Sequence, residues 1–279
     1  MKKVLITGAN SYIGTSFEKY IAENFSEEYQ IDTLDMLDGT WREKSFEGYD
    51  SIFHVAGIAH QKETKENAHL YYDVNRDLAI EVAEKAKKDG VSQFVFLSSM
   101  SVYGMESGVI TCETIPNPKS NYGRSKLMAE EKIAILDSSE FLICVLRPPM
   151  VYGKGCKGNF AKIKKLVEKS PIFPRVKNER SMIYIDNLSL FVHECIQNKL
   201  SGVFLPQNDE YVSTADLVEG ISESMGKKIY FEPISGLAVK ILRKIHPTFK
   251  KAFGSLTYET TEKHSFSFVS KKDSIRRSV

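Results

Sequence analysis

The sequence of 279 residues has little cysteine, and its cysteines form no close pairs. They lack the tight spacing of zinc ligands and the density of a disulfide framework. Scattered thiols of this kind indicate a reducing compartment, so we expect a cytoplasmic protein with free cysteines and no metal site. The four are Cys112, Cys144, Cys156 and Cys195.

Long hydrophobic runs and a strong excess of one charge are also missing. The first apolar run, residues 4–6, has the length of a strand and is too short for an export signal. Nothing in the chain approaches the roughly 18 apolar residues of a membrane-spanning helix. The formal charge is +2, from 38 basic and 36 acidic side chains. We therefore expect no membrane span and no nucleic-acid partner.

The first two thirds of the chain alternate between strand-like and helix-like patterns. Short apolar runs predict strands, and apolar residues at every third or fourth position predict helices. Strands separated by helices are typical of an α/β fold, here a Rossmann-type doubly wound parallel sheet with helices on both faces. The expected strands are 3–7, 29–34, 51–55, 94–98 and 141–147, and the expected helices are 12–22, 71–88 and 122–136.

Beyond about residue 150 the pattern loosens into shorter elements. We expect a dinucleotide-binding domain over 1–150 and a smaller α/β substrate lobe over 151–279, between which chain segments can cross. Ser213 is the expected N-cap of one helix of this lobe. Weak periodicity after residue 257 predicts a frayed end. The helices expected in the lobe are 159–169, 186–198 and 213–225, and the strands are near 183–185 and 203–205.

A small-residue turn, residues 7–14, follows the first expected strand and begins the first expected helix. Small residues there let the backbone approach a pyrophosphate, whose charge is met by the helix N-terminus. Ser11 stands where a second glycine is expected, and its hydroxyl can donate to a phosphate. Asp35 lies about twenty residues after Gly14, where an acid can bind adenosine ribose hydroxyls. This acid favours NAD as the cofactor, while the nearby Arg42 leaves NADP open.

Tyr122 and Lys126 stand four residues apart in a segment of good helix formers. One helical turn separates them, so both side chains point the same way. An ammonium beside a phenol favours the phenolate and lowers a pKa that is about 10 in peptides. Such a phenol can exchange a proton with a substrate hydroxyl near neutral pH. The spacing is common by chance, and a solvated helix face is its alternative interpretation.

Several further motifs occur in a fixed order along the chain. In that order, residues from about 2 to 208 resemble the extended short-chain dehydrogenase/reductase family, in its NAD-dependent nucleotide-sugar epimerase and dehydratase branch. The resemblance is greatest to UDP-glucose 4-epimerase-like members of a bacterial polysaccharide subgroup. The motifs are residues 7–14, 51–57, 72–75, 96–104, 122–126, 146–153 and 180–186.

The resemblance implies a role for each matching residue. Ser99 would hydrogen-bond the sugar hydroxyl that becomes a ketone, and Tyr122 would be the general acid and base. Lys126 would bind the nicotinamide ribose and lower the pKa of Tyr122. Asn159 and Arg180, with Ser99, would bind the substrate, the first two at its diphosphate. The cofactor contacts would be Gly8, Asn10, Ser11, Tyr12, Ile13, Gly14, Asp35, Ala56, Gly57, Asn75, Tyr122 and Lys126.

Departures from the family's motifs bear on the reaction. Dehydratases of this family carry an acidic pair directly after the active-site serine or threonine, where this chain has Met100 and Ser101. Elimination is therefore disfavoured. Met150 stands where epimerases of the galactose type have an asparagine. The segments around it are similar to the polysaccharide subgroup, whose members include epimerases and reductases of 4-keto sugars.

We therefore expect a nucleotide-sugar 4-epimerase that acts on a UDP-linked sugar and forms a homodimer through the helices at 71–88 and 122–136. A 4-ketoreductase of a UDP-4-keto-6-deoxyhexosamine is the first alternative, since both reactions use the same side chains. A non-catalytic NAD(P)-sensing module is the second, and it is disfavoured because a binding protein needs no activated phenol.

Overall fold

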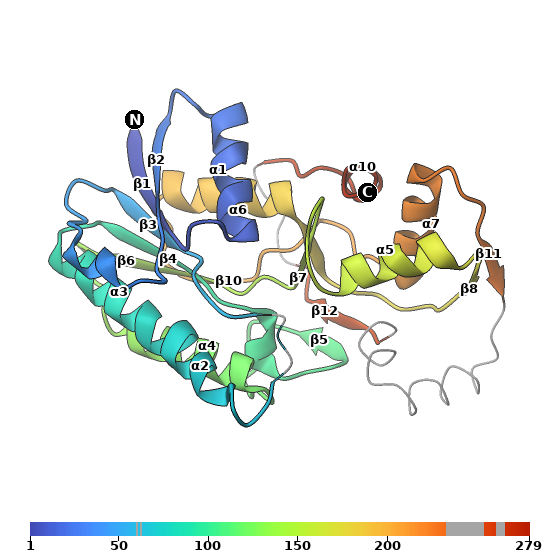
Figure 1. Cartoon of the computed structure of the whole chain (residues 1–279), viewed down its shortest axis with the longest axis horizontal. Coiled ribbons are helices and arrows are strands. Elements are labelled where there is room, and N and C mark those ends of the chain that lie inside the picture. The colour runs from blue at the N-terminus through green and yellow to red at the C-terminus, as the bar shows by residue number, and fades with distance from the viewer. Residues whose placement is uncertain (60, 62, 233–253, 261–265) are drawn as a thin grey trace. The chain divides into compact units, whose positions relative to one another are not determined.

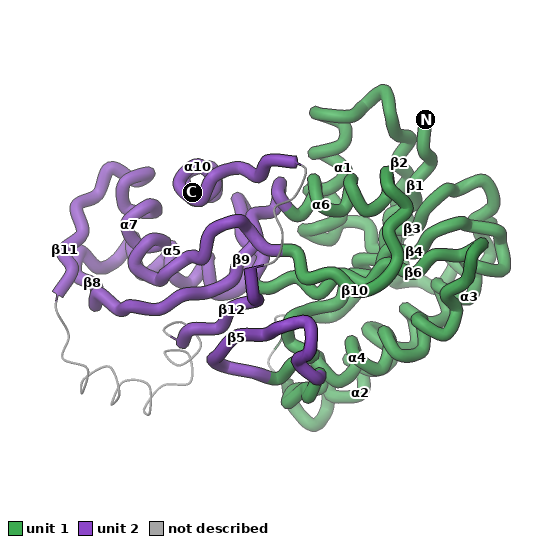
Figure 2. The backbone as a smooth tube through the Cα atoms, turned by 180° about the vertical axis from the view of Figure 1, so that it is seen from behind, with its two compact units in different colours: residues 1–104, 116–149, 188–206 green, residues 105–115, 150–187, 207–279 purple. Residues whose placement is uncertain are grey.

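The structure is a computed structural model that describes residues 1–59, 61, 63–232, 254–260 and 266–279. The chain forms two units, shown in different colours in Figure 2. The chain passes from one unit to the other several times, and one of these passages falls between Pro149 and Met150. Unit 1 is Met1–Gly104, Pro116–Pro149 and Leu188–Pro206, and unit 2 is Met105–Ile115, Met150–Asn187 and Gln207–Val279.

Six strands of unit 1 form one sheet. They are β1 (Lys2–Thr7), β2 (Tyr29–Leu34), β3 (Ser51–His54), β4 (Gln93–Leu97), β6 (Leu142–Leu146) and β10 (Gly202–Phe204). Their order is β10-β6-β4-β3-β1-β2, and every neighbouring pair is parallel (Figure 1). The chain winds outward from β1 in both directions, so the winding reverses between β1 and β3. This confirms the predicted Rossmann-type doubly wound sheet.

Helices cover both faces of this sheet (Figure 1). On one face, Phe17 of the first helix meets Phe53 edge-on, with ring centroids 5.2 Å apart. On the other face, Val82, Phe94 and Ala129 belong to one core cluster and have no exposed area. The first face carries α1 (Tyr12–Asn24) and α6 (Ile185–Gln197), and the second carries α2 (Ala68–Tyr72), α3 (Leu78–Lys88) and α4 (Asn121–Ala134).

The helix predicted over 71–88 forms, and it contains one wide π-helical turn, η2 (Asp73–Asp77), between α2 and α3. The sequence places the segments near 186–198 and 203–205 in the smaller lobe, and it allows chain segments to cross between the lobes. In the structure, residues 188–206 belong to unit 1, where β10 pairs with β6 and extends the sheet. Short 3₁₀ turns, η1 (Thr40–Glu43) and η3 (Met100–Tyr103), complete unit 1.

Unit 2 consists of short parallel strand pairs and helices. Ser213 is the N-cap predicted for the helix α7 (Thr214–Ser224). Its hydroxyl accepts from the Asp216 amide, and the Asp216 carboxylate accepts from the Ser213 amide, each at 2.9 Å. The strand pairs are β5 (Gly108–Ile110) with β12 (Leu256–Tyr258), β7 (Met150–Tyr152) with β9 (Met182–Tyr184), and β8 (Ile172–Pro174) with β11 (Tyr230–Glu232). The helices are α5 (Asn159–Lys169), α7 (Thr214–Ser224) and α10 (Lys271–Arg277).

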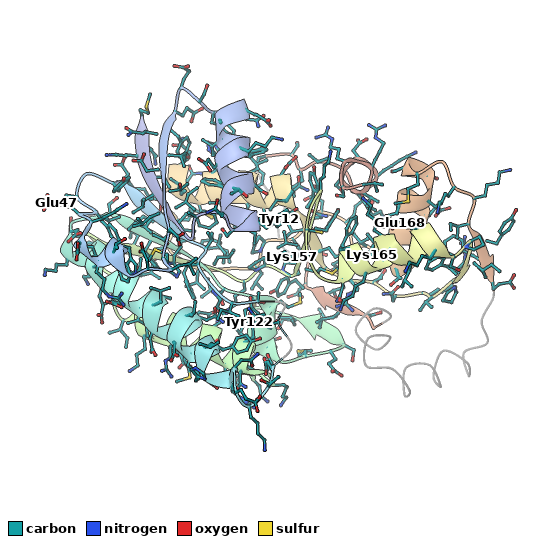
Figure 3. The ribbon with its side chains drawn as sticks, viewed as in Figure 1. Tyr12, Glu47, Tyr122, Lys157, Lys165 and Glu168 are labelled. Carbon is teal, nitrogen blue, oxygen red and sulfur yellow. The ribbon has the colours of Figure 1, made fainter. Side chains whose placement is uncertain are left out.

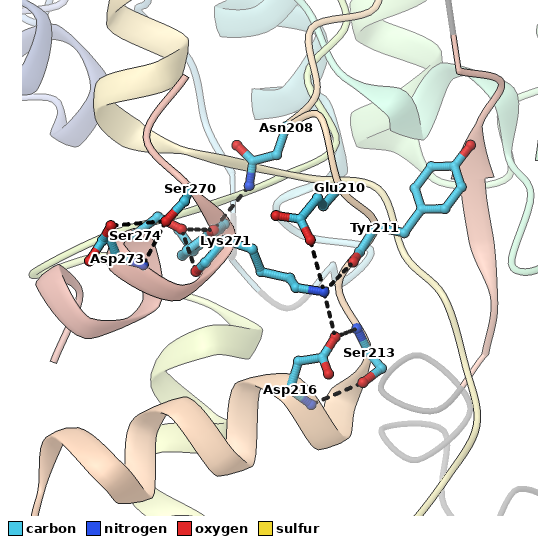
Figure 4. Close-up of polar contacts among 10 residues, drawn as sticks. Asn208, Glu210, Tyr211, Ser213, Asp216, Ser270, Lys271, Asp273 and Ser274 are labelled. Atoms are coloured by element: carbon cyan, nitrogen blue, oxygen red, sulfur yellow. Dashed lines mark hydrogen bonds and ion pairs between the residues drawn. The ribbon is translucent and has the colours of Figure 1, made fainter. Parts of the chain in front are cut away.

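The last residues of the chain form the helix α10, so the prediction of a frayed end is wrong. Polar contacts attach this helix to unit 2 (Figure 4). The Lys271 ammonium lies 3.4 Å from both Glu210 and Asp216. Ser274 is buried and hydrogen-bonds the hydroxyl of Tyr152 at 2.6 Å. Weak periodicity hid this helix because a few buried contacts, and not a long apolar stripe, hold it in place.

Removing the apolar contact of α10 is expected to destabilise unit 2. Ile275 is only 2% exposed and packs against Gly220 of α7. Replacing it with alanine leaves a cavity, and we expect a loss of about 2–5 kcal/mol in the free energy of unfolding. Urea denaturation followed by fluorescence measures this loss. The control is Lys272→Ala on the exposed side of the same helix, and an equal loss in both variants contradicts the prediction.

Candidate active site

The candidate site lies at the carboxyl ends of the strands of unit 1, where the winding of the sheet reverses. In doubly wound sheets, ligands bind at this position. β1 leads into Gly8, β3 leads into Ala56 and Gly57, and β4 leads into Ser98 and Ser99. The sheet therefore brings three of the predicted motifs to one edge.

The turn after β1 requires glycine for close approach. Gly8 has φ +110°, and a Cβ there would lie 2.7 Å from the backbone nitrogen of Ala56. The Ser11 hydroxyl is the N-cap of α1 and accepts from the Gly14 amide at 3.2 Å, which leaves its hydrogen available to a ligand. Asn10 also adopts a positive φ, 64°. This narrow turn before a helix N-terminus fits a pyrophosphate.

Two tyrosines stand near the beginnings of unit 1 helices (Figure 3). Tyr12 is the first residue of α1, and Tyr122 is the second residue of α4. Ile13 follows Tyr12 and is partly buried. Asp35 is exposed directly after β2, and its carboxylate accepts from the Leu37 amide at 3.0 Å. The Arg42 guanidinium, which left NADP open in the sequence, forms an ion pair with Glu81.

Ser99, Tyr122 and Lys126 lie together at this edge. Ser99 is the N-cap of η3, where its hydroxyl accepts from the Ser101 amide at 3.1 Å, and it also hydrogen-bonds the Tyr122 side chain. Lys126 lies one turn beyond Tyr122 on α4, and its ammonium donates to the Leu97 carbonyl at 2.8 Å. The predicted hydroxyl, phenol and ammonium are thus neighbours.

The pKa of Tyr122 departs from the direction that the sequence predicts. Burial raises the pKa of the phenol, the hydrogen bond with Ser99 lowers it, and Tyr71 raises it, with a net increase. The Lys126 ammonium, which the spacing predicts beside the phenol, donates to the Leu97 carbonyl at 2.8 Å. Burial lowers the pKa of Lys126 to about 8, and Glu130 acts in the opposite direction.

Asn75 supports the cleft instead of presenting its amide there. It has no exposed area, and its side chain hydrogen-bonds the Ile58 amide at 2.7 Å, the Ile58 carbonyl at 3.1 Å and the Ser125 hydroxyl at 3.3 Å. A Cβ on Gly57 would lie 2.9 Å from Asn75 Oδ1 and 3.4 Å from Lys126 Nζ. The turn after β3 is therefore held close to the ammonium, and a Cβ there would force the Asn75 side chain to shift.

Sequence reasoning missed two acidic residues beside the predicted ones. The Glu63 carboxylate accepts from the backbone amides of Asn121 and Tyr122, each at 3.2 Å, and caps the helix that carries the phenol. Nothing in the sequence relates Glu63 to that helix. The second residue is Glu130, which is buried. It lies one turn beyond Lys126, so the same spacing that relates Lys126 to Tyr122 could have found it.

Asn159 and Arg180 lie in unit 2, where both line one pocket. Asn159 is the first residue of α5, and the Arg180 guanidinium donates to the Gly254 carbonyl at 3.0 Å. Burial lowers the pKa of Arg180 from its usual value. The pocket thus brings a guanidinium and the amino end of a helix together. Its other lining residues are Met150, Ile163, Val212, Thr214 and Leu217.

The four cysteines are free, and all but Cys112 are buried. Across the described ranges, no group of three or more His, Cys, Asp or Glu side chains could hold a metal ion. Among the helices that the structure describes, none has the length and apolarity needed to cross a membrane.

Comparisons with known proteins agree on one family. The model of the NAD dependent epimerase/dehydratase family matches residues 4–203. A UDP-glucose 4-epimerase of Vibrio cholerae is 30% identical over 270 residues, which cover 88% of this chain and 82% of that protein. An N-acetyl-alpha-D-glucosaminyl-diphospho-ditrans,octacis-undecaprenol 4-epimerase of Escherichia coli O157:H7 is 25% identical over 301 residues, 95% of this chain and 90% of that protein.

A similar fold occurs among solved structures. UDP-glucuronic acid 4-epimerase from Bacillus cereus, in complex with NAD, aligns with 99% of this chain and 95% of its own, with a TM-score of 0.75 and 20% identity. At this level of identity the likeness concerns the fold alone, and it agrees with the doubly wound sheet described above.

Proposed function

Because the chain belongs to the NAD dependent epimerase/dehydratase family, we propose that it is a nucleotide-sugar 4-epimerase that uses NAD and acts on a UDP-linked sugar. The observation that carries this proposal is the meeting of Ser99, Tyr122 and Lys126 beside the glycine turns of unit 1. The epimerase relatives of Vibrio cholerae and Escherichia coli support the reaction class.

The residues of unit 1 fit a dinucleotide. Gly8 and Gly57 leave space that a Cβ would fill, and the Ser11 hydroxyl can donate at the N-terminus of α1. Asp35 would bind the adenosine ribose hydroxyls. When bound, NAD⁺ would supply a hydride acceptor for sugar C4 and a positive charge.

Side chains of the protein would accept and return the proton of the sugar C4 hydroxyl. Tyr122 Oη takes the proton of the sugar C4 hydroxyl and later returns one to the same oxygen. Ser99, which hydrogen-bonds Tyr122, is placed to bond that oxygen as well. Lys126 would bind the nicotinamide ribose. Burial raises the pKa of Tyr122, and a positive charge near its phenolate would act in the opposite direction.

The substrate would bind through its diphosphate. Arg180 and the amino end of α5 at Asn159 suit this group, because a guanidinium and free helix amides both favour phosphate oxygens. We propose a UDP-linked sugar because the Vibrio cholerae relative is named a UDP-glucose 4-epimerase. The Escherichia coli relative is named for a lipid-linked diphosphate sugar, which is the substrate to test beside it.

Sugar turnover followed by NMR tests the proposed function. Purified protein is incubated with UDP-glucose, UDP-galactose, their N-acetylamino counterparts and undecaprenyl-diphosphate N-acetylglucosamine, and the configuration at C4 is measured. We expect interconversion of C4 epimers without net oxidation or reduction. Stoichiometric consumption of NAD(P)H by a 4-keto sugar nucleotide would instead establish the reductase alternative. NAD binding without turnover of any of these sugars would favour the sensing module.

Asp35 is expected to decide the choice between NAD and NADP. In Asp35→Ser, we expect NAD to bind about tenfold more weakly, because a hydrogen bond to a charged group is lost. NADP should bind more tightly, because the repulsion of its 2′-phosphate is removed. Calorimetric titration with each cofactor measures both effects. Asp38→Ser, a second exposed aspartate of the same loop, is the control, and an unchanged NAD affinity in Asp35→Ser contradicts the assignment.

We further propose a cytoplasmic homodimer formed through α2, α3 and α4. Exposed apolar side chains on α2, on α4 and directly after α4 support it: Leu70 is 38% exposed, Met128 39% and Ile135 74%. The four free cysteines are consistent with a reducing compartment. Light scattering after size exclusion tests the dimer, and a monomer mass at micromolar concentration contradicts it.

A further inference from the structure

A buried carboxylate stands one helical turn beyond Lys126. The Glu130 side chain is 6% exposed, and its partner, the Arg147 side chain, is 12% exposed. Arg147 Nε lies 3.0 Å from Glu130 Oε2, and Arg147 Nη2 lies 2.5 Å from the same oxygen. The other carboxylate oxygen accepts from the Ser98 hydroxyl. The carboxylate is thus held on both sides, by an ion pair with Arg147 and by a hydrogen bond from Ser98.

These contacts connect the elements that carry the proposed catalytic side chains. Ser98 directly precedes Ser99, and Arg147 follows β6. The third donor of Arg147, Nη1, donates to the Tyr103 hydroxyl at 2.8 Å, so the guanidinium also holds the far end of η3. Backbone hydrogen bonds join the same segments, from the Ser98 amide to the Leu146 carbonyl at 2.7 Å and from the Met100 amide to the Pro148 carbonyl at 2.9 Å.

We propose that Glu130, held by Arg147, is a positioning residue that keeps the Lys126 ammonium charged and fixes the strand end that carries Ser99. Its consequence for turnover rests on the proposed function, whereas its effect on the charge of Lys126 does not.

The surroundings of Lys126 explain why a carboxylate is needed. The ammonium lies 4.7 Å from the centroid of the Phe96 ring and donates to a carbonyl, and neither group carries a negative charge. The nearby imidazole of His54 is fully buried, and burial together with Lys126 lowers its pKa to about 3, so it is neutral. Burial alone would favour the neutral amine of Lys126, and the charge of Glu130 opposes it.

A purely structural role accounts poorly for this arrangement. A buried ion pair contributes little net stability, because desolvation of both charges offsets their attraction. Apolar side chains of similar volume would serve packing equally well. The position of the pair, between Lys126 and the residue before Ser99, points to the site itself.

The charge of Lys126 is the direct test. Lysine side chains labelled with ¹³C at Cε are titrated by NMR in the protein without added ligand, and the Lys126 signal is assigned by its loss in Lys126→Arg. In Glu130→Gln we expect this signal to titrate at a clearly lower pH than in the wild type. Glu131→Gln, an exposed neighbour on the same helix, is the matched control and should leave the titration unchanged. An unchanged titration in Glu130→Gln overturns the proposal.

A second variant separates positioning from folding. Glu130→Gln leaves Arg147 buried without its counter-charge and could fail to fold, whereas Glu130→Gln/Arg147→Met removes both charges. We expect the double variant to recover thermal stability but to keep the lowered titration of Lys126. Recovery of both properties would show that the pair serves stability alone and would overturn the proposal.

Turnover supplies the last readout. On a substrate that the wild type converts, we expect the double variant to lose roughly 10- to 100-fold in kcat with little change in KM, because misplacement of reacting groups has this cost. The alkaline limit of the kcat profile should also move to lower pH. An unchanged kcat profile, with a wild type that is active, overturns the positioning role. A wild type that converts no sugar overturns the proposed function and leaves the NMR result standing.

Discussion

Replacing Tyr122 with phenylalanine is expected to lower kcat for nucleotide-sugar turnover by about 10²- to 10⁴-fold, which is the usual contribution of general acid–base catalysis. The variant removes one oxygen, the group that hydrogen-bonds Ser99 and that would exchange the proton of the sugar hydroxyl. The ring stays, including its edge-to-face contact with Tyr71 at 6.5 Å between centroids. Stability and NAD binding should therefore change little.

The matched control for this variant is Tyr230→Phe. Tyr230 is 62% exposed on β11 of unit 2, so loss of its hydroxyl should leave kcat unchanged. Turnover is measured by NMR at sugar C4, and NAD binding by calorimetry. Wild-type turnover in Tyr122→Phe would refute the catalytic assignment. Equal losses in the two variants would show that the effect is not specific to the site.

Replacing Lys126 with methionine is expected to lower kcat by about 10²- to 10³-fold, because a preorganised charge is lost from the site. Its effect on stability should be small at pH 7. The lowered pKa of Lys126 corresponds to a cost of about 3 kcal/mol for burying the ammonium, which the variant removes. The lost hydrogen bond to the Leu97 carbonyl costs about 1–3 kcal/mol, which offsets much of that gain.

The stability difference between wild type and Lys126→Met should depend on pH in a defined direction. The folded protein releases the Lys126 proton at about pH 8, whereas the unfolded chain keeps it up to pH 10.5. Between these values the unfolded state binds more protons, so the wild type gains stability relative to the variant as pH rises. Urea midpoints from pH 7 to 9.5 measure this gain. Lys132→Met, an exposed lysine of the same helix, should show no such trend, and a flat difference for Lys126→Met contradicts the expectation.

The sheet of unit 1 could be predicted from the sequence because parallel strands are buried on both faces. Their apolar runs stand out between amphipathic helices, and β2 was predicted at its observed bounds, Tyr29–Leu34. The strand β10 has three residues, Gly202–Phe204. So short a segment has no periodicity of its own, and only its pairing with β6 assigns it to the sheet.

The candidate site was predictable where motif and topology coincide. Ser99 follows a strand, and Tyr122 and Lys126 share a helix face, so their meeting follows from the fold. The sign of the pKa change in Tyr122 was not predictable. It depends on burial and on the direction of the Lys126 side chain, and neither is encoded in a four-residue spacing. The hydrogen bonds of Asn75 were not predictable either. Asn75 lies in the π-helical turn η2, and the spacing of residues in the sequence does not reveal such a turn.

The pairing of β5 with β12 bears on how the chain folds during synthesis. β5, Gly108–Ile110, leaves the ribosome long before β12, Leu256–Tyr258, which is its partner in unit 2. Such a contact between distant parts of the chain forms late and slows folding. Until it forms, β5 presents an unpaired edge between the segments that carry Ser99 and Tyr122, and an unpaired edge is prone to association with other chains. A nascent chain stalled before residue 256 thus lacks the partner of β5.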